Sequence, residues 1–401
     1  MGLLSKISVN RGRQPEIDCL KAFCIVPMIF LHVFEECAEE WGVAYDVLHA
    51  LEVLTGAAAF MMCMGLGVRY SRRQTTGDIL KRALGLLTVA QLLNLLRDSV
   101  PDLIAWLCTG QKVFLSLSLL VFQADILTFA GFAFLLLALL KHLNLSDKAI
   151  LGIGVGMNLA ALLLFQVFQT TGNHLLDQLL GFFVVTKAES YFPLCCYFVF
   201  VATGYALGGL YLRIRDKDTL ANRVLMIGVP VVAAYYALRA TVPFPLYPEF
   251  FTTLQYVLNP LTDALANIAA SLCFLALFHK LLARGSGEAP GLVKHLSGHI
   301  NQYYCISFVL TTPVGTILAA TSGEGMPGTA IPLLYGLFVV TACYFIIEWN
   351  EKHLHFGIVN LEGKRRVAVY TAVWLASVAV FAYAYPQVHE YATFWTDYLM
   401  G

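Results

Sequence analysis

Charged side chains are scarce in this sequence. Only 13% of its 401 residues are Asp, Glu, Lys or Arg, whereas soluble domains usually contain about 25%. Acidic and basic residues balance at 26 each, so the sequence lacks the excess of positive charge that is typical of nucleic-acid-binding proteins. This composition excludes an ordinary soluble enzyme and a disordered chain, and we expect no nucleic-acid partner.

Cysteine motifs are also missing. The chain has ten cysteines but no CxxC pair, which argues against a zinc ribbon or a thioredoxin-like site. Eight of the ten lie within or at the ends of apolar segments, where cysteine behaves as a small buried hydrophobic residue. Only Cys37 and Cys108 fall near the expected external ends of these segments. The cysteines therefore do not predict a disulfide framework.

Long apolar segments are abundant instead. Hydrophobic residues make up 58% of the chain, and its mean hydropathy is +0.70. Eleven segments are close to the ~20 residues that a helix needs to cross the hydrocarbon core of a bilayer. We therefore predict an all-α integral membrane protein that forms a single domain over residues 1–401. The predicted spans are 17–38, 46–68, 79–97, 115–140, 149–168, 192–212, 224–241, 260–282, 297–319, 329–348 and 367–385.

Basic residues predict the orientation of these spans. If the N-terminus is cytoplasmic, 21 of the 26 Lys and Arg residues fall in cytoplasmic segments. Lys21 lies within the first span, and only Arg97, Lys112, Lys187 and Arg239 fall at external ends. Such an asymmetry is the positive-inside pattern of membrane proteins. Eleven spans then place the C-terminus outside the cytoplasm, and we expect the protein in a bacterial plasma membrane.

The first predicted span has ionisable residues on one face. Lys21 and His32 are eleven residues apart in the sequence, which places them about 20° apart around a helix axis and roughly 16 Å apart along it. Asp18 lies within about 40° of His32 by the same geometry. Ionisable groups at membrane depth are costly, so they are functional candidates. Two structural explanations stay open: Lys21 extends to the inner headgroups with Asp18 as its partner, or His32 is hydrogen-bonded to a neighbouring helix.

Polar residues in other spans extend the candidate site. Asp125 lies in the fourth span near mid-membrane, where a carboxylate would orient or charge-stabilise a catalytic imidazole, as in acyl-transfer triads. A hydrogen bond from Asp125 to a neighbouring helix is the alternative. Asn94 and Arg97, at the outer end of the third span, are candidates for binding an external substrate. Asp263 and Asn267, in the outer half of the eighth span, are candidates for the same role.

Glu35 is a further candidate next to the imidazole. It follows His32 by three residues and lies on the same helix face, which adds it to the candidate catalytic residues. A histidine and a glutamate with this spacing also occur in metal sites. We nevertheless expect no metal here.

The first span resembles the signature of the transmembrane acyltransferase superfamily, which includes the acyltransferase-3 proteins and the heparan-α-glucosaminide N-acetyltransferases. That signature is an Asp, a basic residue three positions later and, after ten further residues, a His; it stands here as Asp18, Lys21 and His32. The family usually has Arg at the position of Lys21, and Lys keeps the charge but loses the bidentate guanidinium geometry. Residues 64–87 are similar to the family's glycine-ended second helix and basic turn, and residues 296–304 to its late helix with Ser and Tyr.

The resemblance implies transfer of an acyl group, usually acetyl, from cytoplasmic acyl-CoA to a hydroxyl or amine of an extracytoplasmic acceptor, mainly a carbohydrate. His32 would act as a general base on the acceptor, or would carry the acyl group covalently. Asp125 and Glu35 are the other candidate catalytic residues. We expect a monomer or a homodimer in the bilayer. The residues expected to bind acetyl-CoA are Lys21, Asp18, Arg69, Arg72, Arg73, Ser297, His299 and Tyr303.

Two other classes of function stay open on the sequence. A multi-pass exporter of a sugar or a glycan-linked lipid would favour inverted repeats and paired broken helices, and neither is visible in the sequence. A non-catalytic membrane protein that binds a partner would leave the polar face of the first span without a purpose. Consumption of acetyl-CoA distinguishes the enzyme from both.

Overall fold

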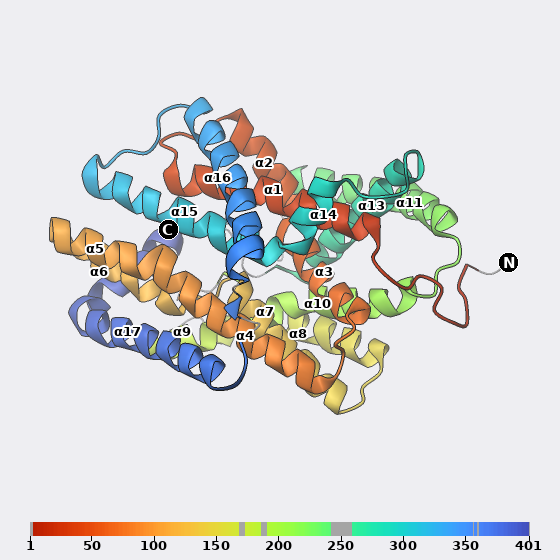
Figure 1. Ribbon diagram of the computed structural model, residues 1–401, viewed down its shortest axis with the longest axis horizontal. Helices are drawn as coiled ribbons and strands as arrows, with labels where there is room; N and C mark the ends of the chain where they lie inside the picture. The colour runs from red at the N-terminus through yellow and green to blue at the C-terminus, as the bar shows by residue number, and fades with distance from the viewer. Residues whose placement is uncertain are drawn as a thin grey trace.

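The fold is built from helices. In the computed structural model, most long helices run side by side along the longest axis of the molecule (Figure 1). Within the described ranges, the other paired backbone is limited to two isolated β-bridges. The predicted all-α class is therefore confirmed. The structure describes residues 3–167, 173–185, 191–241, 259–355, 357–358 and 361–400.

Local sequence signals set several of the helix starts. Pro15 occupies the first turn of α1, where its missing N–H is not needed for an intrahelical bond. Thr75 and Asp78 form a capping box at the start of α4. The elements in chain order are α1 (Pro15–Cys37), α2 (Val43–Leu54), α3 (Gly56–Tyr70), α4 (Thr76–Asn94), η1 (Leu95–Ser99), α5 (Val100–Thr109), α6 (Lys112–Leu117), η2 (Ser118–Phe122), α7 (Ile126–His142), α8 (Asp147–Val167), α9 (His174–Gly181), α10 (Leu194–Tyr211), α11 (Lys217–Thr241), α13 (Leu261–Ala283), α14 (Gly291–Gly298), α15 (Ile300–Thr321), α16 (Ala330–Trp349), η3 (Asn350–Leu354) and α17 (Gly363–Met400).

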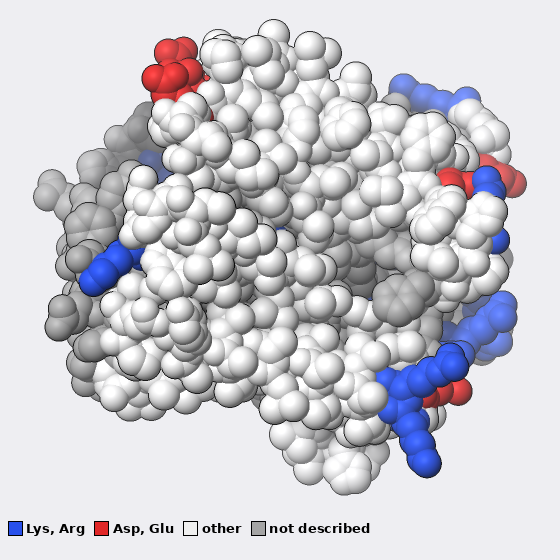
Figure 2. Space-filling model, turned by 60° about the vertical axis from the view of Figure 1, so that its left-hand side comes forward, with Lys and Arg blue, Asp and Glu red and all other residues white. Residues whose placement is uncertain are grey.

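The membrane character of the fold is clear from its helices and its surface. Ten helical stretches of the described chain are long and apolar enough to cross a membrane. They correspond to ten of the eleven predicted spans. Figure 2 shows a broad uncharged face with Lys and Arg side chains towards its margins, as a surface in contact with lipid requires. The chain is an integral membrane protein.

The fourth predicted span, 115–140, is not one continuous helix, and this part of the prediction is wrong. The structure has two shorter apolar pieces there, α6 with η2 and then α7. Gln123 and Asp125 separate them in extended conformations. The carboxylate of Asp125 accepts hydrogen bonds from two backbone N–H groups at the start of α7, so this side chain replaces the bonds that a continuous helix would supply. Non-helical backbone at membrane depth is tolerated where protein surrounds it.

The third predicted span, 79–97, is too short. α4, η1 and α5 form one helical stretch of 34 residues, Thr76–Thr109, well beyond the ~20 residues that cross a bilayer core. Arg97 therefore lies inside this stretch, within the π-helical segment η1, and not at an outer end. Such π segments in helices are frequently found at functional sites.

α1 occupies a central position among helices from both halves of the chain. It packs against α2, α3, α13, α14, α15 and α16. Gly315 of α15 lies directly against the backbone carbonyl of Glu36, and an added Cβ would collide with that oxygen. The close approach of α15 brings its side chains next to the C-terminal half of α1. The two ends of α1 consequently face different sets of polar residues.

Candidate active site

His32 has a carboxylate partner on its own helix. Its Nδ1 lies 3.0 Å from Oε2 of Glu35, one turn later. The imidazole packs on Phe308 of α15, with ring centroids 4.5 Å apart. Because the His32 side chain is 28% exposed, it is accessible from outside the packed core. A neutral imidazole that donates Nδ1–H to a carboxylate has a lone pair on Nε2, which is the form that a general base needs.

A buried charge network contacts the same phenyl ring. The guanidinium of Arg97 lies 4.7 Å from the centroid of Phe308. Its Nε donates to Oδ2 of Asp98 at 2.8 Å, and its Nη1 lies 3.6 Å from Oδ2 of Asp125. These charged side chains are only 5–8% exposed, so each depends on its partners for stabilisation. Asn94, one turn before Arg97, is fully buried and donates to a backbone carbonyl of η2 at 3.1 Å.

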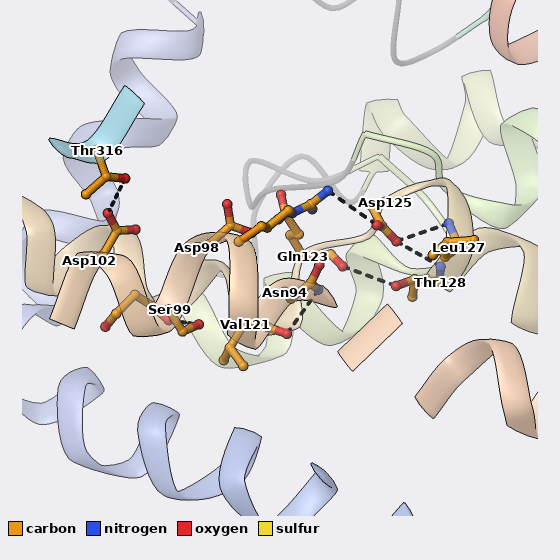
Figure 3. Close-up of polar contacts among 12 residues, drawn as sticks. Asn94, Asp98, Ser99, Asp102, Val121, Gln123, Asp125, Leu127, Thr128 and Thr316 are labelled. Carbon is orange, nitrogen blue, oxygen red and sulfur yellow. Dashed lines mark hydrogen bonds and ion pairs between the residues drawn. The ribbon is translucent and has the colours of Figure 1, made fainter. Parts of the chain in front are cut away.

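The break before α7 supplies the other half of this network. Gln123 Nε2 donates to Oδ2 of Asp98 at 2.6 Å. Oδ1 of Asp125 accepts the two N–H groups of α7 at 3.1 Å and 2.9 Å, and the Tyr304 hydroxyl lies 3.5 Å from Oδ2. Figure 3 shows Asp98 on one helix facing Gln123 and Asp125 at the start of the other. The break therefore brings the side chains of Gln123 and Asp125 next to η1. A continuous helix at this point would not place them there.

Asp125 does not have the partner that the sequence predicts for it. Among the described residues, Asp125 contacts Arg97, Tyr304 and the backbone of α7. Glu35 is the carboxylate that contacts the imidazole of His32. The physical reason is the helix break: Asp125 caps α7, so its carboxylate is directed by that backbone and by the guanidinium. Asp125 thus lies next to Arg97, at 3.6 Å from Nη1.

The sequence does not single out three acidic residues near the site, namely Glu36, Asp98 and Asp102. Glu36 interacts electrostatically with Asp98, His32 and Arg97. Asp102 interacts with Asp98 and Glu36 in the same way. The sequence does hold a signal for two of them, because Asp98 directly follows Arg97 and Asp102 lies one helical turn further on. Asp98 and Asp102 are missed because the predicted third span ends at Arg97, which places both residues outside the membrane helix.

α2 adds polar groups on the other side of His32. Glu52 interacts electrostatically with His32, Glu35 and His49. Tyr45 interacts electrostatically with Glu35. The C-terminal half of α1 is thus surrounded by carboxylates from several helices.

The N-terminal end of α1 forms a second polar cluster. Oδ1 of Asp18 accepts a hydrogen bond from the Ser297 hydroxyl at 2.5 Å, and Oδ2 accepts one from Nε of Arg13 at 2.5 Å. Arg13 also donates to the backbone carbonyl of Lys294 at 2.8 Å. Lys21 is half-buried, and no hydrogen bond or ion pair joins it to another described residue. Two of the residues predicted to bind acetyl-CoA, Asp18 and Ser297, are therefore in direct contact.

The other predicted donor-binding cations lie apart from this cluster. Arg69 forms an ion pair with Asp147 and lies over the ring of Tyr205 at 3.9 Å. It is thus directed towards α8 and α10. Arg72 and Arg73 are exposed beyond the end of α3. They can attract an anion to this end of the molecule.

His299 and Tyr303, also predicted to bind the donor, belong to a third cluster. His299 Nε2 lies 2.8 Å from Oε1 of Glu351. The Tyr303 hydroxyl lies 3.0 Å from Nδ1 of His295. Both contacts are within the α14–α16 region.

The residues predicted to bind an external substrate do not form one group. Asp263 accepts a hydrogen bond from Tyr235 and lies 3.1 Å from Nη1 of Arg239. Asn267 Oδ1 accepts the Tyr236 hydroxyl at 2.6 Å. These two residues of α13 are therefore held by α11, whereas the other two candidates belong to the buried network of η1. Arg97 shares the ring of Phe308 with the imidazole.

These features define a membrane enzyme with an imidazole–carboxylate pair beside a buried charge network. The family model described as heparan-alpha-glucosaminide N-acetyltransferase, catalytic, matches residues 13–256, which is more than half of the chain. The chain belongs to this family, and it is a membrane acetyltransferase. No curated protein and no solved structure matches it.

The matched segment covers the main parts of the site. It contains α1, η1 and the start of α7, and hence His32, Arg97 and Asp125. Acetyl-CoA is the donor that this family uses. The predicted family and enzyme class are therefore confirmed. The helices that supply Phe308 and Ser297 lie beyond the end of the match.

Proposed function

We propose that the protein transfers an acetyl group from cytoplasmic acetyl-CoA to a hydroxyl or amine of an extracytoplasmic carbohydrate. The observation that supports this function most directly is the arrangement of α1. One helix has the Asp18–Ser297 cluster at its start and the His32–Glu35 pair near its end. Lys21 and His32 are roughly 16 Å apart along this helix, which is close to the length of a pantetheine arm.

The start of α1 is the proposed donor end. Arg13, Lys21 and Lys294 bring positive charge to this end, and the positive-inside pattern places it in the cytoplasm. Lys294 also hydrogen-bonds Glu288, which lowers the pKa of that carboxyl. The phosphates of acetyl-CoA would be held by these cations. The thioester would then reach into the bundle towards the far end of α1.

His32 is the proposed general base. Its Nε2 accepts the proton of the acceptor hydroxyl or amine as the oxygen or nitrogen attacks the thioester carbonyl. The C–S bond breaks, CoA leaves as the thiolate, and the imidazolium returns the proton to that sulfur. Glu35 holds the ring through Nδ1–H and stabilises the imidazolium while it exists.

The carboxylates around His32 support a polyhydroxyl or amino acceptor. Glu36, Asp102 and Glu52 surround the imidazole within electrostatic range of one another or of the ring. A carboxylate accepts hydrogen bonds and a protonated carboxyl group also donates one, so either form matches the hydroxyl and amine groups of a sugar. Arg97, Asp98 and Asp125 form a rigid support next to these carboxylates because all three are buried and paired.

Proteoliposomes with the protein in a known orientation test the proposal. Labelled acetyl-CoA is supplied on the side of the α1 N-terminus, and a panel of sugars and amino sugars is placed on the other side. We expect labelled acceptor and free thiol to appear together only in this arrangement. Transfer with both substrates on one side would overturn the transmembrane mechanism. Movement of a sugar without release of CoA would instead favour an exporter.

A further inference from the structure

A compact set of metal-ligating side chains lies away from the proposed active site. His295 of α14, Glu348 of α16 and Glu351 of η3 place one ligand atom each within 4.8 Å of one another. His295 Nε2 is 3.4 Å from Oε1 of Glu348. His299 joins the group through its 2.8 Å contact with Glu351. Two imidazoles and two carboxylates from separate elements therefore converge.

Each imidazole directs the same nitrogen at a carboxylate. Nδ1 of His295 is 3.0 Å from the Tyr303 hydroxyl, and Nδ1 of His299 is 3.0 Å from the backbone carbonyl of His295. A carbonyl only accepts, so His299 donates Nδ1–H and a neutral ring then presents the Nε2 lone pair to Glu351. Two acceptors that face each other need a positive charge, supplied either by a proton on Nε2 or by a metal ion that both atoms bind. Anchoring of one ring nitrogen by a protein oxygen is the usual arrangement around a metal-bound histidine.

The separation of His295 and Glu348 and the surroundings of the cluster also fit a shared ion. Ligands about 2.0–2.2 Å from a tetrahedral Zn²⁺ are separated by about 3.3–3.5 Å, and the His295–Glu348 contact measures 3.4 Å. Lys352 holds the other oxygen of Glu348 at 2.9 Å and so leaves Oε1 free for the ion. The His295 side chain is 12% exposed and that of Glu351 is 50% exposed. The cluster is therefore closed on one side and open to an incoming ion on the other.

We propose that His295, Glu348 and Glu351 bind one divalent transition-metal ion such as Zn²⁺, with His299 as a fourth donor. Imidazole and carboxylate together suit Zn²⁺ better than Mg²⁺, which favours oxygen ligands. The ion would tie α14 to the end of α16. Ser297 of α14 bonds Asp18 of α1, so the ion would also hold the element that contacts the proposed donor end. The sequence predicts no metal, and it gives no local motif for this site: the histidines and glutamates are about 50 positions apart and meet only in the folded chain.

Titration of the purified, chelator-treated protein with Zn²⁺ tests the site. Calorimetry should show one ion bound per chain, and Co²⁺ should give a visible absorption band from tetrahedral coordination. His295→Ala and Glu351→Gln should weaken Zn²⁺ binding by about 100-fold or more, since both remove a direct ligand. His353→Ala is the matched control, because His353 is exposed, lies two residues from Glu351 and packs on Trp349. This control should bind Zn²⁺ as the parent protein does, and excess Mg²⁺ should not displace the ion.

Two results would overturn the site. One is a folded parent protein that binds no stoichiometric Zn²⁺, in which case the contacts are imidazolium–carboxylate ion pairs. The other is a helical His295→Ala protein with unchanged Zn²⁺ affinity. If His295→Ala does not fold, Glu348→Gln keeps the side-chain size and provides the same comparison. None of these measurements uses acetyl transfer, so they test the metal site independently of the proposed function.

Discussion

The two ends of α1 solve the problem of polar groups in a membrane protein differently. At its start, Asp18 is paired with Arg13, whose side chain is 53% exposed, and water shares the stabilisation of the charge. Around its end, Arg97, Asp98 and Asp125 are nearly inaccessible and stabilise one another. An exposed pair is worth little and adapts easily to a ligand, whereas a buried network is costly to break and rigid. The first arrangement suits binding of a large anion, and the second suits exact positioning next to an imidazole.

The largest effect is expected at the imidazole. His32→Ala should fold and still bind acetyl-CoA, but it should lose about 10²–10⁴ in transfer rate, the contribution typical of a positioned general base. Transfer of labelled acetyl and binding of acetyl-CoA are measured on the same preparation. A folded His32→Ala protein with the parent rate would end the proposed role. Label trapped on His32 in the absence of acceptor would replace direct transfer by an acyl-histidine intermediate.

The buried network should dominate stability. Asp98→Ala removes the closest partner of Arg97 and leaves the buried guanidinium with only the longer contact to Asp125, which should lower the free energy of unfolding by about 3 kcal/mol. Denaturation in detergent measures the change. Asp46→Ala is the control, because Asp46 is an exposed acidic residue of α2. Equal stability of both variants would show that the η1 network does not support the fold.

The two carboxylates near the imidazole can be separated by isosteric variants. Glu35→Gln should reduce the transfer rate by at least about 10-fold, but less than His32→Ala, because it perturbs the imidazole and the imidazolium without removing the base. Asp125→Asn should lose less activity than Glu35→Gln, since Asp125 contacts Arg97 and not His32. Steady-state rates at saturating acetyl-CoA give the ranking. The reverse order would restore Asp125 as the partner of the imidazole.

The smallest effects are expected at the donor end. Lys21→Ala and Arg13→Ala should each raise KM for acetyl-CoA a few-fold and leave kcat nearly unchanged, because exposed charge contributes about 1 kcal/mol or less. The increase should shrink at high ionic strength, where attraction between charges is screened. Initial rates at two salt concentrations test this. A fall in kcat with an unchanged KM would contradict a donor-binding role.

Individual residues show which contacts of the candidate site can be predicted from the sequence. The pairing of Glu35 with His32 follows from their spacing of three positions on one helix, and the structure has that contact. Asp18 and Ser297 were both expected near acetyl-CoA, and they do meet. Asp125 was expected within a continuous fourth span, but the chain breaks there and its carboxylate caps α7 and lies near Arg97. Hydropathy cannot report such a break, since two polar residues barely change the average over a long apolar window.

The sequence by itself determined the class of fold, the number of apolar segments and the polar face of α1, because hydropathy and the helical repeat act over neighbouring residues. Tertiary structure decided which charges meet. Arg97 became the centre of a buried network because η1 continues its helix and the start of α7 turns towards it. Asp263 and Asn267 bond residues of α11 because α11 packs on α13. Contacts between helices that are distant in the sequence depend on packing and on satisfying every buried polar group. Neither can be predicted from the local sequence pattern.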